Sequence, residues 1–185
     1  TILAIWLWRT EDRKWVKVLG LISLLTVIAQ GMLGGLTVLL LLPTWISVSH
    51  ATLAQSFFCL TIVLAMVTSP FWREYTPTEF PHAKRTQTLA VTTAAVIFLQ
   101  LILGGVMRHT GSGIAIPDFP LSYGNVLPPF DSGELPAINE YRMGWDMASV
   151  SMSQIWIHFA HRVGALLVAV VVIMNVSHIL STYKE

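Results

Sequence analysis

Charged side chains are scarce in this sequence. Only 11% of its 185 residues are Asp, Glu, Lys or Arg, and 54% are hydrophobic, whereas soluble domains carry about 25% charged residues. The formal net charge of +1 provides no basic surface for nucleic acid. We therefore expect a protein that lies in the lipid bilayer and has no nucleic-acid partner.

Cysteine and buried acids are also nearly missing. Cys59 is the single cysteine, so the chain can form no internal disulfide and no site of paired thiolates. No Asp or Glu occurs within residues 15–67, 88–107 or 155–180. A proton-relay transporter usually needs an intramembrane carboxylate, so a transporter is the weakest of three functions considered below.

Four long apolar runs occupy most of the chain. A helix needs about 20 residues to cross a bilayer, and the runs cover residues 15–42, 45–67, 88–107 and 155–180. The opening TILAIWLW is too short to cross and indicates the end of an earlier helix. The sequence thus predicts an all-α, polytopic transmembrane helix bundle, which we expect to be a piece of a longer protein.

Basic residues predict how these helices are oriented, because they favour the inner side of a membrane. They flank the inner ends of the runs at Arg9, Arg13, Lys14, Lys17, Arg73, Lys84, Arg85 and Lys184. The turn at Pro43 has none, and the loop 108–153 is mainly acidic. We expect inner termini, an inner linker at 73–87 between an amino-terminal part (1–72) and a carboxy-terminal part (88–185), and a long outer loop.

Four of the six histidines fall near the outer ends of the apolar runs: His50, His109, His158 and His161. His109 and His158 are shallow enough to be satisfied by water or the loop. His50 and His161 lie deeper, where an ionisable side chain is a functional candidate. Arg162, next to His161, would need an anion such as a carboxylate or a propionate.

Haem is the ligand that these histidines fit best. Neutral imidazole is a common axial ligand of haem iron, and helix bundles build cofactor sites from inward-facing side chains. A zinc or copper site would usually require three or four close ligands.

A short repeat links the two parts of the chain. The pattern Q-x-x-L-G-G begins at Gln30 and again at Gln100. Each copy precedes an outer connection and then a run with a histidine near its outer end. Gly31 and Gly35 form a G-x-x-x-G pair, which favours close helix packing. This pattern indicates a duplicated helix-pair unit with one histidine site per copy.

Three segments resemble the haem A synthase family. GGVMRHTGSGIAIPDFPLSYGNVLPPF is similar to that family's arginine, T-G-[SA]-G and P-D-[WF]-P-L motif, and IHFAHRVGALL to its H-R signature. QGMLGGLTVLLLLPTWISVSHATLA resembles its helix pair that ends in a histidine-bearing helix. The resemblance implies a duplicated four-helix, haem-binding architecture in which this chain supplies the end of helix two to helix six.

The same resemblance implies the site residues. His50 would ligate the iron of one b-type haem and His161 that of another, with Arg162 beside the second haem. Each site would take its other ligand from helices that this sequence lacks. The family's presumed catalytic glutamate lies three residues before the histidine of helix two. Because that segment is not in this sequence, we assign no catalytic residue. His158 occupies the equivalent register before His161, but the resemblance gives it no role.

The chain also departs from the family pattern. Family members often carry two cysteines in the outer loop, at the positions of Ile116 and Ser122. Both are replaced here, which removes any thiol role for this loop.

The function implied by the resemblance is oxidation of the C8 methyl of haem O to a formyl group, giving haem A for cytochrome oxidase. Haem O synthase and cytochrome oxidase assembly factors would then be partners. A bacterial plasma membrane is a better expectation than the mitochondrial inner membrane. The alternatives are a non-catalytic dihaem b-type or quinone-linked electron-transfer protein, and a small-molecule transporter.

Overall fold

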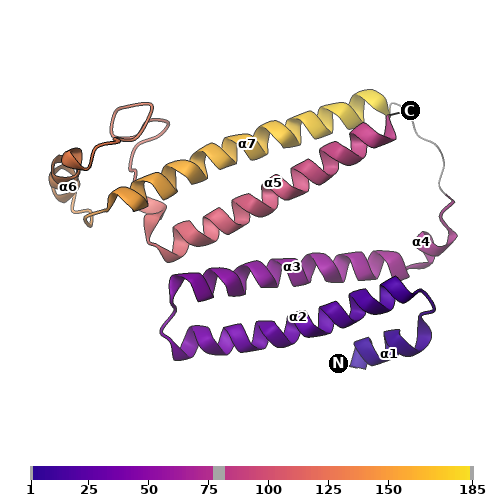
Figure 1. The fold of residues 1–185 in the computed structure, drawn as a ribbon. Helices are drawn as coiled ribbons and strands as arrows, with labels where there is room; N and C mark the ends of the chain where they lie inside the picture. The colour runs from indigo at the N-terminus through magenta and orange to yellow at the C-terminus, as the bar shows by residue number, and fades with distance from the viewer. Residues whose placement is uncertain (1, 77–81, 184–185) are drawn as a thin grey trace. The chain divides into compact units, whose positions relative to one another are not determined.

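A computed structural model describes residues 2–76 and 82–183 of the chain, and nearly all of its regular structure is helical (Figure 1). Among the described residues, an isolated bridge between Ser122 and Asn125 is the only β pairing. Four helices are long and apolar enough to cross a membrane: α2 (Lys14–Leu39), α3 (Thr44–Thr68), α5 (Ala83–His109) and α7 (Met152–Thr182). The predicted all-α membrane bundle is confirmed.

The helices extend beyond the hydropathy boundaries at several ends. α5 begins at Ala83, five residues before the apolar run, and α7 begins at Met152, three residues before its run. Hydropathy marks the part of a helix that suits the hydrocarbon core, whereas backbone hydrogen bonding continues into the interface. α2 instead stops at Leu39, because Leu41 and Leu42 adopt positive φ angles of 57° and 61° in the turn before Pro43.

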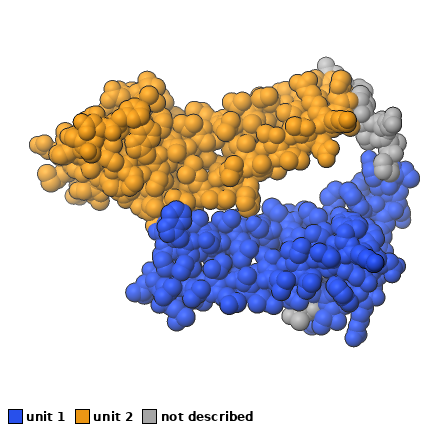
Figure 2. Space-filling model, in the orientation of Figure 1, with its two compact units in different colours: residues 1–79 blue, residues 80–185 orange. Residues whose placement is uncertain are grey.

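The chain forms two compact units, residues 1–79 and residues 80–185 (Figure 2). The first contains α1 (Ile2–Thr10), α2, α3 and α4 (Pro70–Glu74), with α2 packed against α3. Gly20 allows α1 to approach α2, since a Cβ there would lie 2.5 Å from Cδ2 of Leu7. The part of TILAIWLW that the structure describes, Ile2 onward, lies in α1 and is thus helical, as expected.

A buried carboxylate joins two connections of the first unit, α1–α2 and α3–α4. Glu11, 4% exposed, accepts hydrogen bonds from Arg13 Nε and Nη2, both at 2.8 Å, and from Arg73 Nη2 at 3.2 Å. Arg13 Nη2 also donates to the carbonyl of Val67 at 2.8 Å. The hydrogen bonds from Arg13 are the main reason that the pKa of Glu11 lies well below its ordinary value, with burial opposing them. The α1–α2 connection is thereby tied to the end of α3 and to α4.

The second unit is built on α5 packed against α7, which lie side by side in Figure 1. Where the start of α5 meets the end of α7, His178 is buried, and its Nε2 lies 3.0 Å from Oγ1 of Thr86. Thr86 Oγ1 also lies 3.0 Å from the hydroxyl of Tyr183. The contact with Thr86 gives the His178 ring a hydrogen-bond partner within the protein, although the residue lies near a helix end where solvent or lipid headgroups could also supply one.

The connection between α5 and α7, which is the predicted outer loop, has a fold of its own. It contains the short helices η1 (Ser112–Ile114) and η2 (Ser132–Glu134) and the helix α6 (Leu135–Met143). An apolar cluster holds these pieces against the start of α7; its buried members are Ala115, Ile116, Ile138, Val150 and Ile155.

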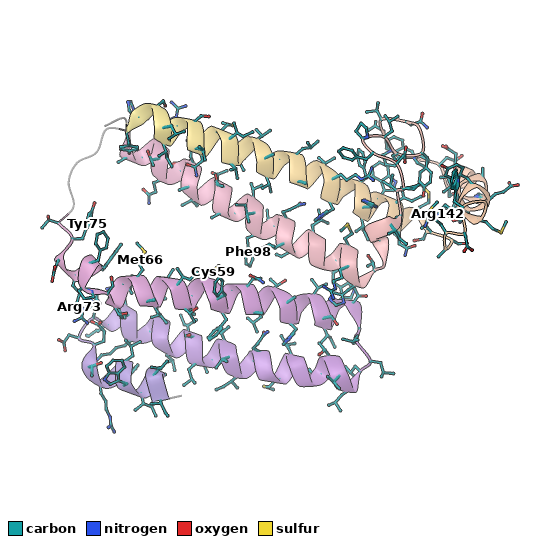
Figure 3. The ribbon with its side chains drawn as sticks, turned by 180° about the vertical axis from the view of Figure 1, so that it is seen from behind. Cys59, Met66, Arg73, Tyr75, Phe98 and Arg142 are labelled. Atoms are coloured by element: carbon teal, nitrogen blue, oxygen red, sulfur yellow. The ribbon has the colours of Figure 1, made fainter. Side chains whose placement is uncertain are left out.

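Arg142, labelled in Figure 3, is the polar centre of this loop. It is completely buried and donates to the carbonyls of Ala148 at 2.7 Å, Ile114 at 3.0 Å and Ala115 at 3.1 Å. Tyr123 donates its hydroxyl hydrogen to the same Ala115 carbonyl. Since buried backbone carbonyls need donors, Arg142 stabilises the loop without an acidic partner.

Candidate functional site

In the first unit, His50 of α3 lies against α2. Gln30 Nε2 donates to the backbone carbonyl of His50 at 3.0 Å and lies 3.5 Å from the ring Nε2. One turn further along α2, a Cβ on Gly34 would lie 3.1 Å from Cε1 of the ring, closer than an ordinary van der Waals contact. A larger residue at position 34 would therefore require the imidazole to shift by a few tenths of an ångström.

In the second unit, His161 of α7 lies against α5 in the same way. Gln100 Nε2 donates to the backbone carbonyl of His161 at 2.9 Å and lies 3.1 Å from Nδ1 and 3.4 Å from Nε2 of the ring. A Cβ on Gly104 would lie 3.2 Å from Cε1. A Cβ on Gly164 would overlap Oε1 of Gln100, so a larger residue there would require the Gln100 amide to move.

The repeat in the sequence therefore corresponds to a repeated structure. Residues four apart share one face of a helix, so the first and fifth positions of Q-x-x-L-G-G both reach the facing histidine. We expected the glycines to serve mainly helix packing, with Gly31 and Gly35 as the pair. Among the described residues, however, a Cβ on either of these would meet nothing within 4 Å. The close contacts belong instead to Gly34 and Gly104.

His158 has different neighbours from His161, although it lies three residues earlier on α7. It is only 9% exposed, so the loop rather than water surrounds its imidazole. Ile116 N donates to its Nδ1 at 3.1 Å, and Arg162 Nε faces its Nε2 at 3.2 Å. A neutral imidazole has one accepting nitrogen, so it can satisfy only one of these donors at a time. Neither nitrogen is open to an external ligand.

Arg162 joins α7 to the outer loop. Its Nη1 donates to the carbonyl of Leu121 and its Nη2 to that of Ile116, both at 2.9 Å. The guanidinium also lies 5.6 Å from the centre of the Phe119 ring. In the part of the chain that the structure describes, the ion pairs within 4.0 Å are those of Glu11 with Arg13 and Arg73. With the contact to His158, three of the five N–H groups of Arg162 have partners, and two remain for an anion.

The P-D-F-P-L segment, residues 117–121, leads into the turn whose Leu121 carbonyl accepts a hydrogen bond from Arg162. Asp118 Oδ1 accepts from Tyr123 N at 2.8 Å, and Oδ2 accepts from Gly124 N at 2.9 Å. Burial raises the pKa of Asp118, but these backbone hydrogen bonds outweigh it, and the pKa lies below its ordinary value. The carboxylate thus stays ionised and fixes the turn that carries the Leu121 carbonyl.

The two histidine sites have the features that a haem ligand requires. Each imidazole is partly buried on a membrane-spanning helix, near the end that the basic residues predict to lie outside. Nδ1 of His50 is buried and has no hydrogen-bond partner among the described residues. No group of three or more His, Cys, Asp or Glu side chains able to hold a bare metal ion occurs in residues 2–76 and 82–183. His50 and His161, with Arg162 beside the second, fit a haem better than an ion.

Several residues that shape these sites were not predicted from the sequence. Gln30 and Gln100 were visible as part of the repeat, but only its glycines were interpreted. Gly164 stands in the HRVG segment, and its role depends on a side chain of another helix. Arg142 gives no signal in the sequence, because a single arginine in an acidic loop resembles an exposed one.

Comparison with known proteins finds one family whose model matches the whole chain. A family model described as "Cytochrome oxidase assembly protein" (COX15-CtaA) matches residues 1–185. The "Heme A synthase" of Lysinibacillus sphaericus is 23% identical over 185 residues, which are 100% of this chain and 54% of that protein. That of Halalkalibacterium halodurans is 28% identical over 192 residues (100% and 55%), and that of Staphylococcus haemolyticus 21% over 170 residues (92% and 49%). The chain spans about half the length of the curated relatives it matches.

Proposed function

Because the chain belongs to the COX15-CtaA family of cytochrome oxidase assembly proteins, the haem A synthases, we propose that the protein containing it oxidises haem O to haem A. The C8 methyl group of haem O would become a formyl group. Removing four electrons and four protons from the methyl carbon and one water molecule accounts for the change, so the reaction needs an electron acceptor. The haem A produced would serve cytochrome oxidase.

The observation that carries this proposal is the duplicated histidine site. His50 and His161 each lie against a Gln–Gly face of the neighbouring helix, with nearly the same contacts. A protein that handles one haem as substrate and another as cofactor needs two such sites. His50 would be an axial ligand in the amino-terminal half and His161 in the carboxy-terminal half.

The chain's own residues would bind and orient the haems. A bound b-type haem supplies an iron centre that can accept and pass on single electrons. Arg162 would direct its two remaining N–H groups to a propionate, since a guanidinium matches the geometry of a carboxylate. Asp118 and the apolar loop cluster would keep the Leu121 and Ile116 carbonyls in place around Arg162. The outer loop would thereby hold Arg162 in position above the second site.

The location and partners follow from the same proposal. The protein lies in a membrane, and the relatives compared above are bacterial, which favours a bacterial plasma membrane. Haem O is the product of a prenyl transfer to haem B, so haem O synthase would supply the substrate. Cytochrome oxidase assembly factors would receive the product.

Extraction of the bound pigment from the full-length protein tests the proposal. The protein would be purified from cells that make haem O, and its haems separated by chromatography and identified by mass. We expect haem O and haem A together with haem B. Haem B alone would favour a dihaem electron-transfer protein, and a protein without haem would exclude both functions.

A further inference from the structure

We propose that Gln30 and Gln100 are positioning residues that hold His50 and His161 against the facing helix before haem binds. The inference rests on the proposed haem function for its purpose, but the contacts themselves lie within each unit. It goes beyond the histidines, because it assigns a role to the first residue of the repeat and to the glycine four positions later.

The hydrogen bond to the backbone is the fixed part of each contact. Gln30 Nε2 donates to the His50 carbonyl at 3.0 Å, and Gln100 Nε2 donates to the His161 carbonyl at 2.9 Å. This bond also determines which end of the amide faces the histidine, since only the NH₂ group can donate to a carbonyl. It does not involve the imidazole, so it can remain when a ring nitrogen binds iron.

The contact with the ring is the part that haem would replace. In the second unit, Gln100 Nε2 lies 3.1 Å from Nδ1 of His161 and 3.4 Å from its Nε2. An amide N–H can only donate, so in the tautomer whose facing ring nitrogen is unprotonated it takes up the lone pair that iron needs. The imidazole is thus restrained before haem binds. Gly104 leaves room for the Cε1 edge of the ring.

The glycines show that each cradle is shaped for its histidine. At Gly34 and Gly104, an added Cβ would lie 3.1 and 3.2 Å from Cε1 of the ring. Gly164 clears the space for the Gln100 amide from the opposite helix. The same arrangement of a glutamine and a glycine against a histidine ring occurs in both copies. The partners that orient a metal ligand are often worth 10–100-fold in affinity.

Gln30→Met and Gln100→Met test the inference, because methionine keeps the length and volume of glutamine but cannot donate. Two readouts would be taken on the full-length protein. The first is the nitrogen chemical shifts of the histidine rings in haem-free protein labelled at histidine. The second is the low-spin electron paramagnetic resonance signals and the retention of added haem B.

We expect Gln100→Met to shift the ring nitrogens of His161 and to weaken haem retention at that site about 10-fold, with the His50 site unchanged. Gln30→Met should do the converse. Gly164→Ala should reproduce Gln100→Met, and Gly34→Ala should disturb His50, whereas Gly35→Ala is the matched control without effect on either ring.

Unchanged ring shifts in both methionine variants would overturn the inference. If the wild-type protein binds two haems, haem signals in both methionine variants that match those of the wild type would overturn it as well. If the wild-type protein bound no haem, the proposed function would fail. The ring shifts of the haem-free protein would then still decide whether the glutamines hold the histidines.

Discussion

At the level of single residues, neighbours on one helix have separate tasks. His158 and Arg162 connect α7 to the outer loop through Ile116 and Leu121, whereas His161 faces α5. Both ring nitrogens of His158 face N–H donors. His158 is thus held by two separate partners, the loop backbone and Arg162, whereas the described contacts of the His161 ring nitrogens are with the Gln100 amide. We therefore propose His161, rather than His158, as the ligand.

Replacing Arg162 by leucine should weaken the second haem site in the full-length protein. Loss of a positive charge near the iron favours the oxidised form, so the midpoint potential of that haem should fall. A redox titration followed by absorption would measure it, with Arg9→Leu, an exposed arginine of the first unit, as the control.

Arg162→Lys separates charge from geometry. Lysine keeps the charge but lacks the planar fork that can bond two carbonyls and a carboxylate together. Compared with Arg162→Leu, the lysine variant should have a midpoint potential close to that of the wild type, but it should retain little more haem. Identical potentials and haem content in wild-type and Arg162→Leu proteins would show that Arg162 does not contact a propionate.

At the level of elements, polar side chains fasten the ends of the helices, and apolar contacts join their middles. Glu11 ties the α1–α2 connection to α3 and α4, as the position of Arg73 on α4 in Figure 3 helps to show. Arg142 does the same for the outer loop through three backbone carbonyls. Both are buried ionic side chains whose loss would leave donors or acceptors unpaired.

Glu11→Gln should lower the melting temperature of the first unit and reduce its acid sensitivity. The folded-state pKa of Glu11 lies below its ordinary value, so its stabilisation is present above about pH 4.3, the pKa in an unfolded chain, and is lost as the pH falls from there. Thermal melts of the full-length protein at pH 7, 5 and 3 would measure the difference from wild type.

Asp12→Asn is the control for this change, since Asp12 is the adjacent exposed acid. It should melt like the wild-type protein at all three pH values. A Glu11→Gln protein that behaved in the same way as Asp12→Asn would contradict the role given to the Glu11 cluster.

At the level of the whole molecule, the four membrane helices and the repeat were predictable, because hydropathy and spacing are local properties of the sequence. The site roles of His50, His161 and Arg162, which their depth and the family resemblance indicate, stay predictions. The contacts of Gln30 and Gln100 were not predictable, since they depend on which helix faces which. The internal structure of the outer loop depends in the same way on the buried Arg142.

The orientation in the membrane remains a prediction from the basic residues. In a Cys59→Ser background, Ser132→Cys should react with a membrane-impermeant thiol reagent added outside intact cells, and Lys84→Cys should react only after the cells are opened. Both positions are exposed in the structure. Labelling of Lys84→Cys from outside would reverse the topology.

The central claim is that His50 and His161 ligate two different haems. Absorption and electron paramagnetic resonance spectra of full-length His50→Ala, His161→Ala and the double variant test it most directly, with His158→Ala as the control. Each single variant should lose or convert to high spin a different low-spin haem, the double variant should lose both, and His158→Ala should keep both. Loss of the same haem in both single variants, or of neither, would contradict the account.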